Sequence, residues 1–430
     1  MKVVLITLPH PYLRQPKAQV SLGLLYLASV LEMHKTKVEV KNYSAFTTDG
    51  AIADLPDADI YGITITSMEL LQANRFAQKI KEKYSNKVVF LGGPGTISDE
   101  FVDWDQIDAI CKGEGEITIF DMIEDYLTGQ LKKIYVGKCY EDLDLIPFPA
   151  RHLISYQGGN IFAYNKNYIE GTGIQKSGGS VTILTSRGCP YNCAFCSAPK
   201  LSNQVRFRDP DLIRQEIEHI IDKYGIRQFR ISDDMFTTNE KHVRAICEKI
   251  KHLDIVWRIS VRAKPLSIDL LRVMKDAGCR EISIGVESFD NDVLRILNKG
   301  ITAEENMLAL ETCADVGLKT RVLFMIRTPG QTKKTIPLNI DMLRSTRYDI
   351  IACTTFIPLP GSDIWNNPDK YNIKILNRNM DDYNFYFFNK DKENKLKNII
   401  RIKDRSLEDL NKETTHFKEF LKSTGKLNTG

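Results

Sequence analysis

The chain has 430 residues, of which 43% are apolar and 27% charged, a composition typical of a folded globular protein with room for two or three domains. This composition excludes a disordered, a collagen-like and a small disulfide-stabilised chain. The net charge of +4 comes from residues 366–430, which carry 14 Lys or Arg against 10 Asp or Glu. The rest of the chain is neutral and lacks the positive charge of a general nucleic-acid-binding protein.

The cysteines and the apolar segments predict a cytoplasmic protein without a membrane span. The nine cysteines are an odd number and too sparse for a disulfide framework, which indicates a reducing compartment. The apolar run Val3–Ile6 is too short for the core of a signal peptide. The longer run Leu22–Leu31 has about half of the ~20 residues that span a bilayer.

Residues 1–140 alternate between short β-branched runs and amphipathic stretches, as parallel sheets covered by helices do. The predicted strands are Val3–Thr7, Lys37–Asn42, Asp59–Thr66, Lys87–Leu91 and Ala109–Lys112. The predicted helices lie near Val20–Glu32, Glu69–Tyr84 and Glu116–Tyr126. This α/β block therefore predicts a doubly wound, Rossmann-like domain whose ligand site lies at the carboxyl ends of the strands.

Glycines follow two of these strands, at Leu91–Gly95 and at Gly113–Glu116. Glycine lets a backbone approach a bulky ligand, although a tight loop between a strand and a helix also requires it. Residues 141–180 then lose the alternation and contain the turn-forming pairs Gly158–Gly159 and Gly178–Gly179, so we expect a linker there.

The alternation starts again in residues 181–365. The predicted strands are Val181–Thr185, Gln228–Ser232, Val256–Ser260, Glu281–Val286, Leu318–Met325 and Ile350–Phe356. Helical stretches separate them, which predicts a partial (β/α)6 barrel of the TIM type. Residues 366–430 are predicted to form a small helical cap. Its aromatic residues either line a substrate pocket or form the core that docks the cap: Tyr383, Phe385, Tyr386, Phe387 and Phe388.

Directly after the first strand of the second block, the loop Arg187–Cys196 carries Cys189, Cys193 and Cys196 in a C-x3-C-x2-C spacing. Thiolates on so short a loop converge on one metal centre, either zinc or an iron–sulfur cluster. A structural zinc site needs a fourth ligand, which would have to come from far along the chain. A cluster held by three cysteines leaves one iron open for a substrate, which favours the cluster. The other cysteines are predicted to be core residues: Cys111, Cys139, Cys247, Cys279, Cys313 and Cys353.

At these residues the chain resembles the radical S-adenosylmethionine (SAM) family, whose signature places an aromatic residue, here Phe195, directly before the third cysteine. The resemblance implies a [4Fe–4S] cluster on the three cysteines, with SAM bound to the open iron. It also implies SAM-binding residues after the next three strands: Asp233, Asp234, Arg262, Gly285, Glu287 and Ser288. The two aspartates would accept from the SAM ammonium unless they cap a helix, Arg262 would bind its carboxylate, and Glu287 its ribose.

Two positions depart from the family's pattern around the turn Thr328–Thr332. Arg327 stands where a glycine is usual, and Gln331 stands where a glutamate is usual. In the sequence, these departures are the only support for a non-catalytic protein that binds SAM or cobalamin as a sensor.

The order of the two blocks resembles that of the cobalamin-binding radical SAM enzymes. A methylthiotransferase would carry three further cysteines in the first block, which has only Cys111 and Cys139. The resemblance implies a cobalamin site on the loops after the strands of the first block: Pro9, His10, Ser67, Met68, Gly92, Gly93, Pro94, Gly113 and Glu114. His10 lacks the nearby Asp that would orient its imidazole, so we expect it to line the cofactor rather than to bind cobalt.

The resemblance thus implies a cobalamin-dependent radical SAM methyltransferase. A methyl group would pass from methylcobalamin to an unactivated carbon, or to a phosphinate phosphorus, after a 5′-deoxyadenosyl radical abstracts hydrogen. The substrate would be a small molecule or a peptide, and an external flavodoxin or ferredoxin would supply electrons. The alternative is a cyclase or rearrangement enzyme that uses the same cofactors without methyl transfer. The sequence identifies no catalytic acid or base.

Overall fold

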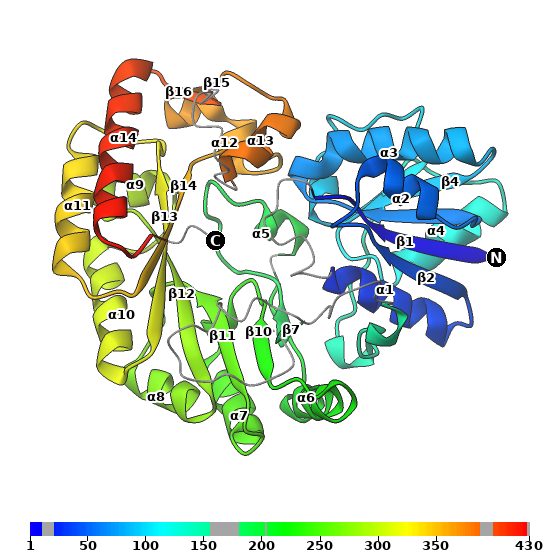
Figure 1. Ribbon diagram of the computed structural model, residues 1–430, viewed down its shortest axis with the longest axis horizontal. Coiled ribbons are helices and arrows are strands. Elements are labelled where there is room, and N and C mark those ends of the chain that lie inside the picture. Colours follow the sequence, from blue (N-terminus) through cyan, green and yellow to red (C-terminus); the bar gives the residue numbers. More distant parts are fainter. Residues whose placement is uncertain (11–20, 155–179, 203, 388–398, 428–430) are drawn as a thin grey trace. The chain divides into compact units, whose positions relative to one another are not determined.

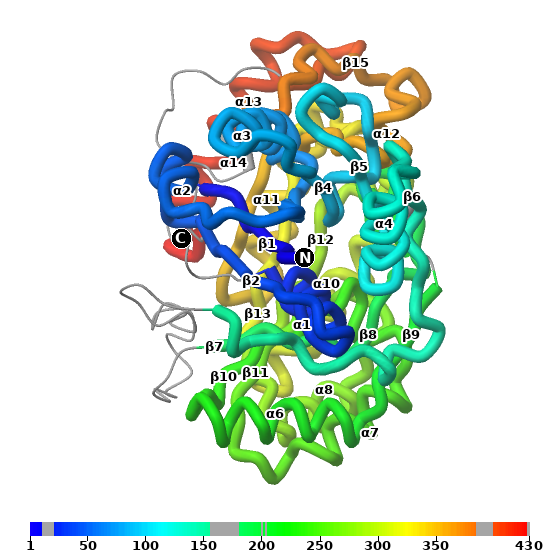
Figure 2. Tube along the Cα trace, turned by 90° about the vertical axis from the view of Figure 1, so that its right-hand side faces the viewer, coloured from blue at the N-terminus to red at the C-terminus, as the bar shows by residue number. Residues whose placement is uncertain are grey.

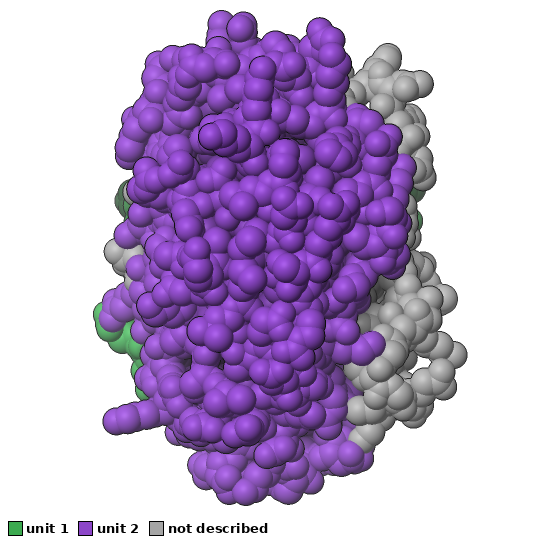
Figure 3. Space-filling model, turned by 90° about the vertical axis from the view of Figure 1, so that its left-hand side faces the viewer, with its two compact units in different colours: residues 1–165, 200–202, 379–388 green, residues 166–199, 203–378, 389–430 purple. Residues whose placement is uncertain are grey.

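The computed structural model describes residues 1–10, 21–154, 180–202, 204–387 and 399–427. The chain divides into two compact units, which Figure 3 colours separately. Unit 1 comprises residues 1–165, 200–202 and 379–388, and unit 2 comprises residues 166–199, 203–378 and 389–430. Within the described ranges, no helix combines the length and the apolar character needed to cross a membrane.

Unit 1 is built on a parallel sheet of six strands in the order β2-β1-β3-β4-β5-β6. The strands are β1 (Lys2–Thr7), β2 (Lys37–Asn42), β3 (Ile60–Thr64), β4 (Val88–Gly92), β5 (Ala109–Lys112) and β6 (Ile134–Val136). The helices from the first part of the chain are α1 (Leu22–Met33), α2 (Thr48–Asp54), α3 (Leu70–Lys83) and α4 (Thr118–Leu127). The strand order reverses at β1, as in the predicted doubly wound fold.

Both faces of this sheet are covered, because successive strand residues point to opposite sides. Val4 and Ile6 lie in a core shared with α3, whereas Val3 and Leu5 lie in a core shared with α1 and α4. The strand β6 was not predicted, because only Tyr135 of its three residues is buried and no apolar run marks it.

Unit 2 is built on a second sheet of six parallel strands, which pair in chain order. The strands are β7 (Ser180–Ile183), β10 (Gln228–Ile231), β11 (Val256–Val261), β12 (Cys279–Glu287), β13 (Lys319–Ile326) and β14 (Ile350–Thr355). The helices are α6 (Pro210–Tyr224), α7 (Glu240–Ile250), α8 (Ile268–Asp276), α9 (Asn291–Ile296), α10 (Ala303–Val316), α11 (Thr335–Ser345), α12 (Asp363–Asn366) and α14 (Leu407–Ser423). The residues of the short helix α5 (Ala198–Leu201) are divided between the two units. The long helices cover the outer side of the sheet (Figure 1), and α6 lies beside α7 (Figure 2).

Local signals set the ends of these helices. At the start of α10, Thr302 and Glu305 exchange side-chain-to-backbone hydrogen bonds, and Gly317 ends the helix with φ +75°. Two short antiparallel pairs complete unit 2, namely β8 (Ser186–Arg187) with β9 (Arg206–Phe207), and β15 (Ile373–Ile375) with β16 (Ile400–Ile402).

Residues 366–430 do not form the single helical cap that the sequence predicts. Their helix α13 (Met380–Phe387) belongs to unit 1, where it contacts α3 and the 3-10 turn η2 (Ser67–Glu69) (Figure 2). Tyr383 is fully buried there, and Asp381 pairs with Arg75 at 2.9 Å. The physical reason is that α13 buries its apolar residues on unit 1, whereas α14 buries Phe417 on unit 2. Phe388 and the side chains of residues 384–387 lie outside the described part of the chain.

Candidate functional site

The loop with the three cysteines, called here the cysteine loop (residues 187–196), follows β7 at the carboxyl edge of the second sheet. Cys189, Cys193 and Cys196 are partly exposed on this loop. Four of the remaining cysteines are buried as predicted: Cys111, Cys247, Cys279 and Cys313. Cys353 is partly exposed, and the prediction is wrong for Cys139, which is exposed because it follows the edge strand β6.

The thiols of Cys189 and Cys196 lie in an environment that disfavours their ionisation. Burial raises the pKa of the Cys196 thiol to about 11, and the neighbouring Cys193, Cys189 and Asp234 add to the rise because negative charges would repel one another. Burial also raises the pKa of Cys189. A positively charged iron centre reverses this balance, because a coordinating thiol is held as the thiolate.

Arg262, just after β11, holds the cysteine loop from one side. Its Nη1 donates to Cys193 Sγ at 3.3 Å, and its guanidinium stacks 3.8 Å from the ring centroid of Tyr191. Its other terminal nitrogen donates to the carbonyl of Lys299. The residue predicted to bind the SAM carboxylate is therefore buried against the thiol of Cys193.

The segment after α9 holds the same loop through hydrogen bonds. The Ala194 amide donates to the Leu297 carbonyl at 2.9 Å, and Asn298 Nδ2 donates to the Asn192 carbonyl at 2.7 Å. On the other side, the Ile364 amide donates to the Ala194 carbonyl at 3.0 Å. Two segments that are distant in sequence thus fix the loop backbone at Asn192 and Ala194.

Glu287 forms a buried ion pair with Lys299 beside this loop. Their side chains are 12% and 6% exposed, and Glu287 Oε1 lies 2.9 Å from Lys299 Nζ. Lys299 Nζ also lies 5.6 Å from the ring centroid of Phe195. A Cβ on Gly285 would lie 2.8 Å from Glu287 Oε1 and 3.0 Å from Lys299 Nζ, so the absence of a side chain at Gly285 leaves room for this ion pair.

Lys299 was missed by the sequence analysis. Glu287 ends β12, and Lys299 follows the short helix α9. No sequence pattern indicates that these two residues form an ion pair. The structure brings together Lys299, Arg262, Glu287 and Phe195 around the cysteine loop.

The other predicted SAM-binding residues take different places. Asp233 is 7% exposed and accepts hydrogen bonds from the Thr185 amide at 2.7 Å and from the hydroxyls of Thr185 and Ser186, so it holds the two residues that precede the cysteine loop. Asp234 is exposed and acts electrostatically on Cys189. Ser288 is buried, and its hydroxyl lies 3.3 Å from Asn339 Oδ1.

The donor set at the cysteine loop fits a cluster better than a single ion. The described residues contain no group of three His, Cys, Asp or Glu side chains that converges on one ion. The zinc alternative therefore gains no support from this part of the chain, whereas a cluster matches three soft ligands with one position left open.

The residues predicted to contact cobalamin lie in unit 1 after four neighbouring strands. Pro9 and His10 follow β1, Ser67 and Met68 follow β3, Gly93 and Pro94 follow β4 after Gly92 ends it, and Gly113 and Glu114 follow β5. Because β1, β3, β4 and β5 are parallel neighbours, their carboxyl ends share one edge of the sheet. The structure thus brings these positions to the edge where doubly wound sheets bind ligands.

The glycines at this edge have different physical reasons. A Cβ on Gly93 would lie 2.6 Å from Thr64 Oγ1, and Gly93 has φ +91°, so packing and backbone conformation both require glycine. A Cβ on Gly92 would meet no atom within 4 Å. Of these two residues, Gly92 is therefore the one at which a ligand can approach the backbone.

His10 has a carboxylate partner that the sequence analysis missed. His10 Nδ1 lies 2.9 Å from Glu69 Oε1, and both side chains are largely buried. Glu69 also accepts from the Thr66 amide at 2.6 Å, which fixes the carboxylate. The sequence has no Asp near His10 that could orient its imidazole. Glu69 of η2, 59 residues further along the chain, supplies a carboxylate for this role.

The comparisons with known proteins agree with these observations. The sequence profile of the Radical SAM superfamily matches residues 183–343. The chain is 28% identical to an uncharacterised methyltransferase of Pyrococcus horikoshii over 371 residues, covering 80% of this chain and 77% of that protein. It is 27% identical to the anaerobic magnesium-protoporphyrin IX monomethyl ester cyclase of Rubrivivax gelatinosus over 383 residues, covering 77% of this chain and 66% of the cyclase.

A solved structure shares the fold of both units. The radical SAM methyltransferase TsrM from Kitasatospora setae, with cobalamin and a [4Fe–4S] cluster bound, aligns with a TM-score of 0.64 at 17% identity, covering 84% of this chain and 73% of that chain. The predicted resemblance to the radical SAM family is confirmed by the profile match, and the chain shares its fold with a radical SAM enzyme whose structure contains cobalamin.

Proposed function

We propose that this chain, whose residues 183–343 form a radical SAM domain, is a cobalamin-dependent methyltransferase. The observation that carries the proposal is the cysteine loop at the carboxyl edge of the second sheet, in the same chain as a doubly wound unit with a glycine-lined edge. The second sheet is proposed as a partial (β/α)6 barrel, because its six strands pair in chain order. Relatives named as methyltransferases support the reaction class.

The chain's own residues would bind the cofactors and orient them. Cys189, Cys193 and Cys196 would hold a [4Fe–4S] cluster, and Asp234 and Glu287 offer carboxylates for SAM at the same edge. The edge around Gly92 would receive cobalamin, with His10 held by Glu69. When bound, these cofactors supply a substrate radical and a transferable methyl group. The role of the protein is to position the reacting groups and exclude water.

An alternative reaction class keeps the same cofactors. The cyclase of Rubrivivax gelatinosus is 27% identical to this chain, against 28% for the methyltransferase relative, so ring closure without methyl transfer is the second candidate. The sensor hypothesis loses its only support, because Arg327 and Gln331 have a structural reason described below. We further propose a cytoplasmic location, a small-molecule or peptide substrate, and an external flavodoxin or ferredoxin as electron donor.

The test is anaerobic purification after co-expression with genes for cobalamin uptake and cluster assembly. Iron, sulfide and cobalamin are assayed in one sample, and the sample is then incubated with methyl-labelled SAM and a reductant. We expect a cluster, about one cobalamin per chain, 5′-deoxyadenosine, and label on the bound corrinoid. A cluster without cobalamin would overturn methyl transfer by this route, and cobalamin that never takes label would favour the cyclase.

A further inference from the structure

The two departures from the family pattern, Arg327 and Gln331, lie in the turn that follows β13. Each is 3% exposed. Arg327 has φ +59°, a left-handed conformation that glycine adopts freely and arginine adopts at a cost. The contacts of the Arg327 side chain must therefore offset the conformational energy of this backbone geometry.

Both side chains contact α14, about 80 residues further along the chain. Arg327 Nε donates to Thr414 Oγ1 at 2.9 Å, and its terminal nitrogen donates to Asn411 Oδ1. Gln331 Oε1 accepts from the Arg327 amide at 2.7 Å, and Gln331 Nε2 donates to Glu413 Oε2 at 2.9 Å. The side-chain amide of Gln331 thus forms hydrogen bonds through both its oxygen and its nitrogen, one to the turn and one to α14.

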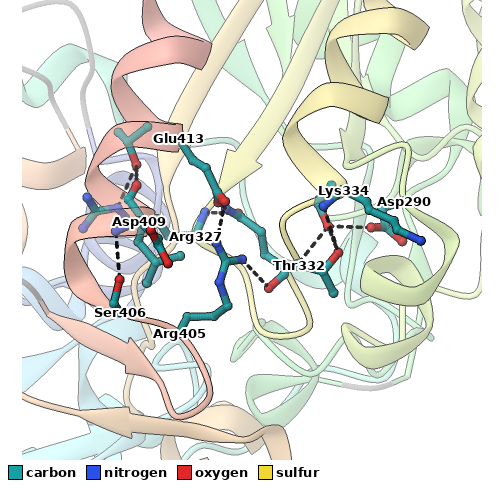
Figure 4. Close-up of polar contacts among 12 residues, drawn as sticks. Asp290, Arg327, Thr332, Lys334, Arg405, Ser406, Asp409 and Glu413 are labelled. Carbon is teal, nitrogen blue, oxygen red and sulfur yellow. Dashed lines mark hydrogen bonds and ion pairs between the residues drawn. The ribbon is translucent and has the colours of Figure 1, made fainter.

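Arg405 completes this set of contacts, which we call the α14 network: Arg327, Gln331, Arg405, Asn411, Glu413 and Thr414. Figure 4 labels Arg327, Arg405 and Glu413 of this network. Arg405 forms a largely buried ion pair with Glu413 and donates to the Gln331 carbonyl at 3.4 Å. Beside the network, Phe324 of β13 stacks on Phe417 of α14 with ring centroids 5.4 Å apart. The turn is therefore held to α14 by polar contacts next to an aromatic core contact.

The opposite side of the same turn supports the segment that holds the cysteine loop. A Cβ on Gly330 would lie 2.5 Å from Ile296 Cδ1, so the turn packs directly on the end of α9. The next residues, Leu297 and Asn298, hold Ala194 and Asn192 as described above. A continuous set of contacts within unit 2 therefore joins α14 to the backbone beside Cys193.

We propose that Arg327 and Gln331 are positioning residues for the cysteine loop. They fix the turn after β13 to α14, and the fixed turn supports Ile296–Asn298 beneath the loop. In this arrangement α14 is an integral part of the cluster-binding unit. The inference rests on the proposed function only in taking the cysteine loop as the cluster site, because neither cobalamin nor methyl transfer enters it.

The variant that tests the proposal is Gln331→Glu. The new carboxylate still accepts from the Arg327 amide, but it faces Glu413 where an amide donated, so two like charges oppose each other. In the full-length chain we expect hydrogen exchange in α14 and in residues 187–196 to become roughly tenfold faster. The EPR spectrum of the reduced, reconstituted cluster should broaden, because the ligands then adopt several geometries.

The double variant Gln331→Glu with Glu413→Gln reverses donor and acceptor, and the amide oxygen at position 413 can still accept from Arg405. The carboxylate at position 331 keeps one negative charge in the network, so both exchange and EPR spectrum should move back towards those of the wild type. Thr415→Glu adds the same charge on an exposed position of α14 and should change neither. If Gln331→Glu does not fold, Arg327→Gly removes the guanidinium contacts while suiting the positive φ, and it should speed exchange in the same two segments.

Two results would overturn the proposal. Faster exchange in α14 with an unchanged cysteine loop would show that the turn does not support the loop. A double variant that stays as impaired as the single one would show that the Gln331–Glu413 contact is not the cause. Exchange is measured before cofactors are added, so failure here is distinct from a failure to bind cobalamin or to transfer methyl.

Discussion

A buried charge is stable only while its partner is present, and the Glu287–Lys299 pair is such a case. Replacing Lys299 by Met leaves the Glu287 carboxylate unpaired in a nearly closed environment. We expect the free energy of unfolding to fall by roughly 3–5 kcal/mol, measured by urea denaturation followed by circular dichroism.

The matched control is Lys264→Met, which removes a lysine paired with Glu305 at 2.7 Å but 67% exposed. Exposed pairs contribute less than about 1 kcal/mol. An equal decrease in the free energy of unfolding in the two variants would mean that burial of the Glu287–Lys299 pair does not increase its contribution to stability.

The thiol of Cys196 offers a pH-dependent test on the cluster-free protein. Its pKa is raised to about 11 by burial, and only the thiolate reacts with iodoacetamide. Below this pKa the thiolate fraction grows with pH, so its alkylation rate should rise about tenfold per pH unit up to roughly pH 10. Peptide mass spectrometry gives the rate, with exposed Cys139 as the internal reference; a rate that levels off near pH 8 would contradict the assigned burial.

At the same scale, the sequence predicts residues whose spacing is local and misses pairs formed by the fold. The three cysteines and Phe195 occupy one short loop, so their pattern is visible in the chain. Glu69 and Lys299 acquire their roles only when η2 meets β1 and α9 returns beside β12. No local pattern contains that information.

Helix α14 is the element whose packing was least visible in the sequence, because its apolar residues could have served a detached cap. Phe417 is fully buried and stacks on Phe324. Phe417→Ala should lower the free energy of unfolding by about 3–5 kcal/mol, and hydrogen exchange should be fastest in α14. Leu308→Ala, at a position 67% exposed, should change stability by less than about 0.5 kcal/mol; a similar change in both would place α14 outside the core.

Among the elements, strands of four or more residues were predicted, whereas strands of two or three residues were missed. The predicted strand Lys37–Asn42 coincides with β2, and the predicted strand Gln228–Ser232 exceeds β10 by one residue. The strands β6, β15 and β16 have three residues each, too few to show an alternation. Their pairing depends on neighbours already in place.

For the whole molecule, the two proposed cofactor sites lie in different units and should be separable. Replacing Cys189, Cys193 and Cys196 together by Ala should abolish iron binding while leaving unit 1 folded. Cobalamin retained per chain, assayed after anaerobic purification, should stay close to the wild-type value. Retention of stoichiometric iron would refute the cluster site, and loss of cobalamin would show that its binding depends on an intact unit 2.

The two alternating blocks of the sequence correspond to the two sheets, because hydrophobic periodicity reports burial on both faces of a parallel sheet. The assignment of α13 to unit 1 is different. This assignment depends on which unit offers an apolar surface for Met380 and Tyr383, which are both fully buried. Their position in the sequence does not predict which unit that is.

The position of α13 in unit 1 also has a consequence for co-translational folding. Chains generally fold from the amino terminus as they emerge, yet the last helix of unit 1 is made only after all six strands of the second sheet. The nascent unit 1 must therefore keep the surface over α3 and η2 uncovered throughout the synthesis of unit 2. A truncated protein that ends after residue 165 lacks α13. An isolated unit 1 that reproduces the fold described here must therefore include residues 379–388, connected to the first part by a linker.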